Sequence, residues 1–271
     1  VQIADGYAPG EGVDAVKDIY LPCLSNCNKH KRVTFSFNSS ALATLSEGLE
    51  ALIENDGSLE LVIGDTLSFN EERSIKEGEK AKNKGFQDIC LARLNLLFQE
   101  ENLNKDDFKY KLGLLTNLIG SDKLTIKFAF KKERLNPDAY DISKQHTKIA
   151  IFEGNNDELV VWGGSSNLSN SGLKDNLEEF SVFKSWDVES GYNRHAPRLL
   201  KTWKSLWNDN LEDWKVEEVP GEFYEKWKKR FPKRNEVKKK KRDKIKYQID
   251  PKIWNHKKEA IEIFLEKKKG I

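Results

Sequence analysis

The sequence predicts a layered α/β domain built around a mixed β-sheet. Alternating, β-rich runs are separated by stretches whose apolar residues recur at helical spacing, as in sheets whose strands are linked through helices. Two of these runs, 147–153 and 158–164, are joined only by a GNND turn. So short a link makes them an antiparallel hairpin, and the sheet is therefore expected to be mixed.

The elements follow in order along the chain. VTFSF at 33–37 alternates and is rich in β-formers, and the segment 38–55 that follows has Ser and Asn capping candidates and helical periodicity. An Asn-Asp-Gly turn signal then precedes a strand at 58–64. The same criteria predict helices at 70–80, 84–101, 105–119 and 195–214, and strands at 124–130, 147–153, 158–164 and 178–186. No internal repeat is visible, and we expect the fold to end near residue 215.

The helix expected at 195–214 is amphipathic, with Leu199, Trp203, Leu206 and Trp207 on one face. Its tryptophans, and Trp214 after them, fit a core or an interface better than platforms for stacked bases. His195 fits the start of this helix better than a catalytic role, although Arg194 and Arg198 nearby have the reach to contact a phosphate.

Composition narrows the class of protein. The chain has 271 residues, 38% of them hydrophobic and 33% charged, which suits a folded domain with a sizeable core. Its three cysteines fit a reducing compartment and no metal-ligand spacing, so we expect a cytoplasmic protein. No apolar run reaches the ~18 residues of a membrane span, and no signal peptide is recognisable.

The charge is distributed unevenly. Residues 220–271 contain 19 of the 46 Lys and Arg and 8 of the 44 Asp and Glu, a net +11, which leaves −9 on residues 1–219. The dense segment 226–246 also holds Trp227 and Phe231, a composition suited to a phosphate backbone. The alternative is a solvated basic linker. The DNA-binding candidates are Lys228, Lys229, Arg230, Lys238, Lys239, Lys240, Lys241 and Arg242.

Two short motifs carry the chemistry. His146 and Lys148 lie two residues apart at the start of a strand, so both side chains project from one face. Ser165 and Asn167 have the same spacing just after the next strand, which the hairpin brings back to this end. Gly163 and Gly164 allow close backbone approach. One cation with several hydrogen-bond donors around it suits a phosphate.

These residues resemble the signature of the phospholipase D superfamily, H-x-K-x4-D followed by G-S-x-N and a later glutamate. His146, Lys148, Gly164, Ser165, Asn167 and Glu178 match it position by position, whereas Glu153 stands where the pattern has aspartate. The resemblance implies a phospholipase D-like mixed sheet flanked by helices on both faces. It also implies a phosphodiesterase in which His146 becomes a phosphohistidine, with Lys148, Ser165, Gly164 and Asn167 holding the phosphate.

The resemblance further implies that no metal or other cofactor is needed. Either Glu178 or Glu153 would orient an imidazole. The mechanism needs a second histidine to protonate the leaving group, and none of the other three histidines begins a complete signature. His256 has Lys258 two residues later, but isoleucine stands at 263 in place of the carboxylate. We therefore expect a homodimer joined through the active-site face, with His146 of both copies in one composite site.

The first 215 residues look like the nuclease domains that precede helicase motors in bacterial restriction and anti-phage enzymes. Residues 216–271 are expected to be a basic linker and the start of a truncated superfamily 2 helicase module, so helicase or ATPase domains are expected partners in a longer protein. DNA is the expected substrate. A lipid substrate would fit paired motifs or membrane spans, and a catalytically silent DNA-binding or dimerisation module remains the alternative function.

Overall fold

The computed structural model describes residues 2–8, 10–35, 37, 41, 44–64, 113–114, 116–131, 145–169, 172–173 and 176–230. Its strands are β1 (Gly6–Tyr7), β2 (Cys27–Thr34), β3 (Ser58–Gly64), β4 (Leu124–Lys131), β5 (Ile149–Gly154), β6 (Leu159–Gly164), β7 (Phe180–Lys184) and β8 (Trp214–Glu218). Its helical segments are η1 (Ala15–Tyr20), α1 (Leu21–Asn26), α3 (Ser46–Glu54), η4 (Asn155–Asp157), η6 (Val188–Ser190), α7 (Tyr192–Trp207) and α8 (Gly221–Arg230).

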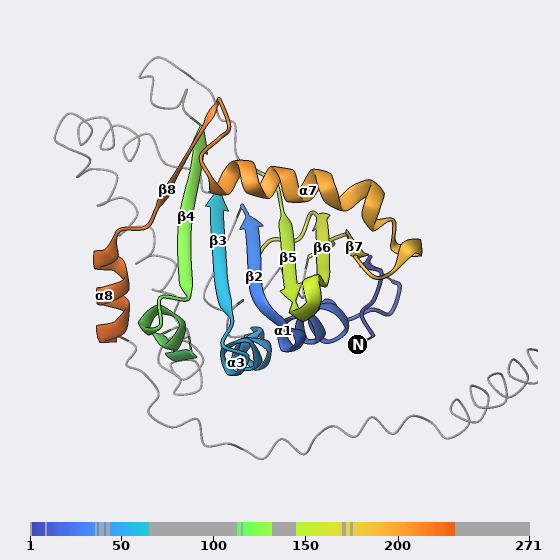
Figure 1. The fold of residues 1–271 in the computed structure, drawn as a ribbon, viewed down its shortest axis with the longest axis horizontal. Coiled ribbons are helices and arrows are strands. Elements are labelled where there is room, and N and C mark those ends of the chain that lie inside the picture. The colour runs from blue at the N-terminus through green and yellow to red at the C-terminus, as the bar shows by residue number, and fades with distance from the viewer. Residues whose placement is uncertain are drawn as a thin grey trace, which may run out of the picture. The chain divides into compact units, whose positions relative to one another are not determined.

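The described strands form one mixed sheet in the order β1-β7-β6-β5-β2-β3-β4-β8 (Figure 1). The pairs β2 with β3 and β3 with β4 are parallel, whereas β5 is antiparallel to both β2 and β6. The expected hairpin and the mixed sheet are therefore confirmed. The strand predicted at 58–64 has the bounds of β3. The strands predicted at 124–130, 158–164 and 178–186 match β4, β6 and β7, and each end lies within two residues of its predicted position.

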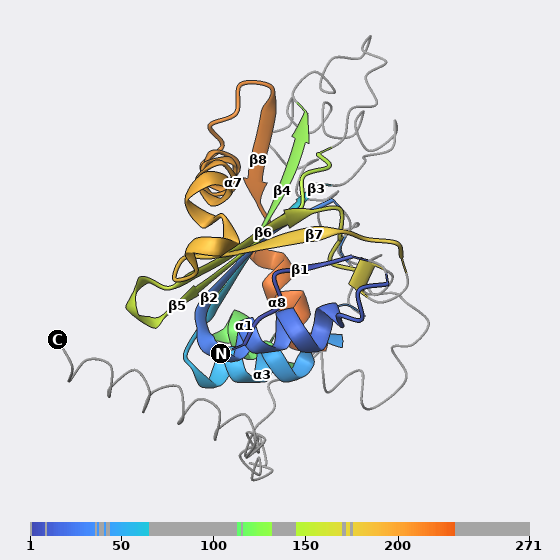
Figure 2. The ribbon, with the colours of Figure 1, turned by 90° about the vertical axis from the view of Figure 1, so that its right-hand side faces the viewer.

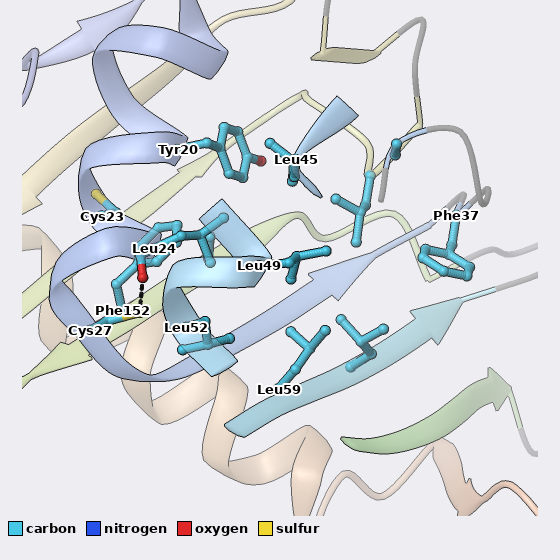
Figure 3. Close-up of a cluster of buried hydrophobic side chains, with 14 of the residues drawn as sticks. Tyr20, Cys23, Leu24, Cys27, Phe37, Leu45, Leu49, Leu52, Leu59 and Phe152 are labelled. Atoms are coloured by element: carbon cyan, nitrogen blue, oxygen red, sulfur yellow. Dashed lines mark hydrogen bonds between the residues drawn. The ribbon is translucent and has the colours of Figure 1, made fainter. Parts of the chain in front are cut away.

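Helices cover both faces of the sheet, as expected (Figure 2). On one face, α1 and α3 pack over Leu59 and Phe152 through Leu24, Leu49 and Leu52 (Figure 3). On the other face, Trp203 and Leu206 of α7 pack against the side chains that point to that face from the central strands, among them Val33, Ile151 and Val161. Trp203 and Trp207 stack with ring centroids 5.0 Å apart, so both belong to the packing of α7, as predicted.

Several boundaries differ from the expectation. β2 begins at Cys27 and ends at Thr34, six residues before the predicted start and three before the predicted end at 37. α7 ends at Trp207, because Asp209 has a positive φ and its carboxylate accepts hydrogen bonds from Lys215 Nζ and the Val216 amide. The chain then forms β8 on the edge of β4.

The boundary expected at 215 therefore falls inside β8. After it, Val219 and Phe223 are buried in the core, and the Ile126 amide donates to the Tyr224 hydroxyl at 3.0 Å. All residues described up to Arg230 belong to one compact unit. The helices expected at 70–80, 84–101 and most of 105–119 lie outside the described residues. Within the described part of the chain, no helix has both the length and the apolar composition that crossing a membrane requires.

Candidate active site

The ends of four neighbouring strands lie together on one side of the sheet. β2 and β6 end there, and β5 and β7 begin there, because each is antiparallel to its neighbour in this half of the sheet. The register pairs Val33 with Ile149, Ile149 with Gly163, and Gly164 with Phe180. Residues just beyond these ends are thus brought together, which confirms that the segment after β6 returns to the start of β5.

His146 and Lys148 are adjacent, as their spacing predicts. The imidazole is exposed, whereas Lys148 is only 3% exposed. Lys148 Nζ lies 2.8 Å from His146 Nδ1 and donates a hydrogen bond to the His146 carbonyl at 2.9 Å. The ring of Phe35 lies beside both, 5.6 Å from the imidazole centroid and 5.9 Å from Nζ. An exposed imidazole is thereby joined to a cation held within the fold.

The burial of Lys148 changes its acidity. Removal from water lowers its pKa from 10.5 to about 8; Glu178 opposes the shift by attraction, and Arg32 adds to it by repulsion. The ammonium form therefore predominates at neutral pH and is lost at mildly alkaline pH. Such a group supplies a positive charge, but within a limited pH range.

Ser165 and Glu178 form a second pair in the site. The Ser165 hydroxyl donates to Glu178 Oε2 at 2.5 Å and accepts from the Glu179 amide at 2.9 Å. The other carboxylate oxygen, Oε1, accepts from Asn176 Nδ2 at 3.1 Å. Glu178 is 7% exposed, so its charge is largely withdrawn from water beside the hydroxyl. The structure thus brings Glu178 to the site, in contact with Ser165.

Asn167 is tied to the end of β2. Thr34 Oγ1 donates to Asn167 Oδ1 at 3.5 Å and accepts from the Leu168 amide at 2.9 Å. A parallel bridge between Phe37 and Leu168 continues this contact. The half-buried amide of Asn167 is therefore held at the same edge as Lys148.

The two glycines at the end of β6 serve packing. A Cβ on Gly164 would overlap the Glu179 carbonyl and the backbone of Phe180, so the position accepts only glycine at this approach of β6 to β7. A Cβ on Gly163 would lie 2.9 Å from a methyl group of Leu199 on α7. The Gly164 amide donates to the Lys148 carbonyl at 3.4 Å. Gly164 thus links the end of β6 to the start of β7 and to the residue before β5. Its contact with a phosphate stays a prediction.

Glu153 does not reach the site, contrary to one expectation. It pairs in register with Lys29 at the opposite end of β5, and its carboxylate forms an ion pair with Lys31. Since Ile149 marks the site end of the strand, the length of β5 separates Glu153 from His146. Of the two carboxylates considered for the site, the structure brings only Glu178 there.

The other candidates lie elsewhere or outside the described residues. Lys228 and Lys229 lie on α8, where Lys228 pairs with Glu225 at 2.8 Å. Arg230 ends this helix, and Lys238, Lys239, Lys240, Lys241 and Arg242 lie outside the described residues. His195 stands in the first turn of α7, as expected, and its ring stacks on Phe183. Among the described residues, no group of three or more His, Cys, Asp or Glu is arranged to hold a metal ion.

Sequence reasoning missed Arg32, Thr34, Phe35 and Asn176. Arg32 and Thr34 are two residues apart on β2, the same spacing that drew attention to His146 and Lys148. The signal was therefore present. Arg32 precedes the strand expected at 33–37, and the partners of Arg32 and Thr34 lie more than 100 residues away in the chain, so the pair is not recognisable locally.

No family model matches the chain, and no curated protein matches it. Solved structures similar to it include Nuc, a phospholipase D family member from Salmonella typhimurium, with 14% identity over 75% of this chain and 92% of that one, and a TM-score of 0.37. NucT from Helicobacter pylori has 15% identity over 77% and 95%, and a TM-score of 0.38. Phosphatidylserine synthase from Haemophilus influenzae has 13% identity over 83% of this chain and 44% of that one, and a TM-score of 0.40. Values this low assign no activity.

Proposed function

We propose that this chain is a phospholipase D-type phosphodiesterase that cleaves DNA without a metal ion, through a phosphohistidine at His146. One observation carries the proposal: the exposed imidazole of His146 lies 2.8 Å from the buried ammonium of Lys148, at the end of the sheet to which the strand register also brings Ser165 and Asn167. A nucleophile next to a fixed cation and neutral donors is what attack on a phosphodiester requires.

The contact between Lys148 and His146 suggests how the nucleophile is released. While the ammonium donates to Nδ1, a neutral imidazole carries its own proton on Nε2. A bound phosphodiester competes for this ammonium through a non-bridging oxygen. Once Nζ turns to the phosphate, the ring proton can move to Nδ1, and the Nε2 lone pair is free to attack phosphorus.

The chemical steps balance with a second imidazole. The P–N bond to His146 forms as the P–O bond to the leaving group breaks, and the leaving oxygen takes a proton from the partner subunit's His146. That imidazole then accepts a proton from water, whose oxygen attacks phosphorus and breaks the P–N bond. We propose a homodimer for this reason. The exposed imidazole and the 85% exposed Leu177, next to Glu178, are consistent with a second copy on this face.

Cleavage of supercoiled plasmid in EDTA tests the proposal. We expect nicked or linear product with the wild type and a loss of at least about a thousandfold for His146→Ala, as on removal of other catalytic nucleophiles. His195→Ala is the matched control, because His195 is also exposed but lies on α7. A labelled oligonucleotide bound covalently to the wild type, stable in alkali and released by acid, would identify the phosphohistidine.

Two results would contradict this function. Equal cleavage by the wild type and His146→Ala would remove His146 as the nucleophile. A folded wild type that binds DNA but cuts none would instead favour the catalytically silent module. Activity that requires added Mg²⁺ would contradict metal independence alone.

A second proposal concerns the larger enzyme in which the nuclease acts. We propose that the nuclease acts beside a superfamily 2 helicase motor in a restriction or anti-phage enzyme, since residues 253–271 resemble the segment just before the phosphate-binding loop of such motors. Cleavage by the motor-containing protein should then respond to ATP, and cleavage by the present chain should not. An identical response of both proteins to ATP would contradict this setting.

A further inference from the structure

Arg32 is a buried charge close to the site that the proposed mechanism does not use. It lies on β2 and is 0% exposed. On the neighbouring strand β5, Arg32 pairs with Ala150. Side chains of an extended chain alternate between the two faces of the sheet, so Ala150 and Lys148, two residues apart, lie on the same face. The Arg32 side chain therefore lies on the face of the sheet from which Lys148 projects. It lies two residues further along the strands, away from the end of the sheet where the site is.

Its contacts lead directly to the segment that carries Ser165 and Asn167. Nη2 donates to the Ser166 carbonyl at 2.5 Å, and the guanidinium carbon lies 4.1 Å from the ring centroid of Trp162 on β6. Ser166 lies between the two site residues, and its own hydroxyl donates to the Gly172 carbonyl at 2.8 Å. Because this hydrogen bond holds the Ser166 carbonyl toward Arg32, it fixes the backbone from which the Ser165 and Asn167 side chains project.

The hydrogen bonding of Arg32 is incomplete for a purely structural arginine. Among the described residues, its Nε and Nη1 atoms have no hydrogen-bond partner. A buried cation with unsatisfied donors is costly, and an apolar side chain of similar volume is often as stable or more so. Its electrostatic partners include Glu178, which attracts it, and Lys148, which it repels. Stability alone therefore gives a weak reason for an arginine at this position.

We propose that Arg32 is a positioning residue of the active site: it anchors the Ser166 carbonyl so that Ser165 and Asn167 are held at the phosphate, and its charge attracts Glu178 and repels Lys148. The inference rests on the proposed function for its effect on cleavage. Its effect on Lys148 follows from the structure alone. Lys148 is faced by His146 on its own segment, Glu178 before β7, Phe35 after β2 and Arg32 on β2.

Two substitutions separate anchoring from charge. Arg32→Met keeps length and apolar volume but removes the charge and the hydrogen bond, whereas Arg32→Lys keeps the charge without the planar fork. Lys201→Met, on the exposed side of α7, is the control for loss of one distant charge. The readouts are the unfolding temperature, kcat and KM for plasmid cleavage in EDTA, and the titration of Lys148 by NMR of isotope-labelled lysines, assigned with Lys148→Arg.

We expect Arg32→Met to unfold at or above the wild-type temperature while kcat falls about ten- to a hundredfold, the scale of a small misplacement of catalytic groups. Its Lys148 midpoint should move to higher pH, because a repelling cation has been removed. Arg32→Lys should keep the wild-type midpoint and recover part of kcat. Lys201→Met should match the wild type in all readouts.

Wild-type kcat and an unmoved Lys148 midpoint in Arg32→Met would overturn the inference. So would a loss of kcat that only tracks a lower unfolding temperature, since that result indicates a structural role. If Arg32→Met does not fold, Arg32→Lys decides: reduced kcat with an unmoved midpoint supports positioning, and unchanged kcat overturns it. If the wild type cuts no DNA, the proposed function fails, whereas the NMR midpoints still test the coupling of Arg32 to Lys148.

Discussion

At the scale of single residues, the charge of Lys148 sets the pH range of the site. Its pKa is lowered to about 8, first by burial, with Glu178 raising it and Arg32 lowering it. Below this pH the ammonium is present and can bind a phosphate oxygen; above it the charge is lost. We therefore expect kcat/KM for DNA cleavage to fall as pH rises through about 8, measured on plasmid DNA between about pH 6 and 10.

Lys148→Arg tests the assignment of this alkaline limb. Arginine stays protonated over the whole range, so the variant should be less active but should lose the decline near pH 8. Survival of the same decline in Lys148→Arg would assign it to another group. Lys204→Arg, at an exposed position late in α7, is the matched control and should keep both the activity and the limb.

At the scale of elements, the approach of β7 to the end of β6 holds the site together. Gly164 has no room for a Cβ against Glu179 and Phe180, the residues that follow Glu178. In Gly164→Ala the start of β7 must shift, which should cost about 1–3 kcal/mol of unfolding free energy and move Glu178 away from Ser165. Cleavage should fall more than the population of folded protein does, as measured by thermal unfolding and plasmid assays on the same samples.

Gly154→Ala provides the control within the same hairpin. Gly154 lies at the far end of β5, and a Cβ there would meet its nearest atom, the Asn26 carbonyl oxygen, at 3.4 Å. This variant should keep wild-type cleavage. Equal effects of the two substitutions would mean that Gly164 acts on general stability rather than on the site.

The elements also show how far sequence reasoning reaches. The hairpin and β3 could be predicted because their signals are local: a GNND turn, and an alternating run after Asn-Asp-Gly. β2 was placed too late because His30 and Arg32 are buried only through contacts with Ile151, Phe152 and Ser166, far away in sequence. β8 was missed for the same reason, since its pairing with β4 is not visible locally. The motif residues came together through register, whereas Glu153, assigned from the motif alone, did not.

At the scale of the whole molecule, the proposed mechanism requires two copies. Leu177 is 85% exposed immediately before Glu178, and Val188 is 89% exposed after the other end of β7. If the second copy covers the active-site face, Leu177→Asp should weaken both dimerisation and cleavage, because it places a charge in an apolar contact. Val188→Asp should change neither. Sedimentation over a dilution series measures the first effect, and plasmid cleavage at matched concentrations the second.

A mixture of wild type and His146→Ala tests whether the two copies share one catalytic centre. If each centre needs His146 from both subunits, only wild-type homodimers cut, and activity should fall with the square of the wild-type fraction after subunit exchange. An equal mixture should then retain about a quarter of the activity, whereas independent centres would retain about half. His195→Ala in place of His146→Ala should leave the activity of the mixture unchanged, since His195 stacks on Phe183, toward the end of β7 that is opposite the site. A linear dependence would show that one copy is sufficient, and another acid would then have to protonate the leaving oxygen.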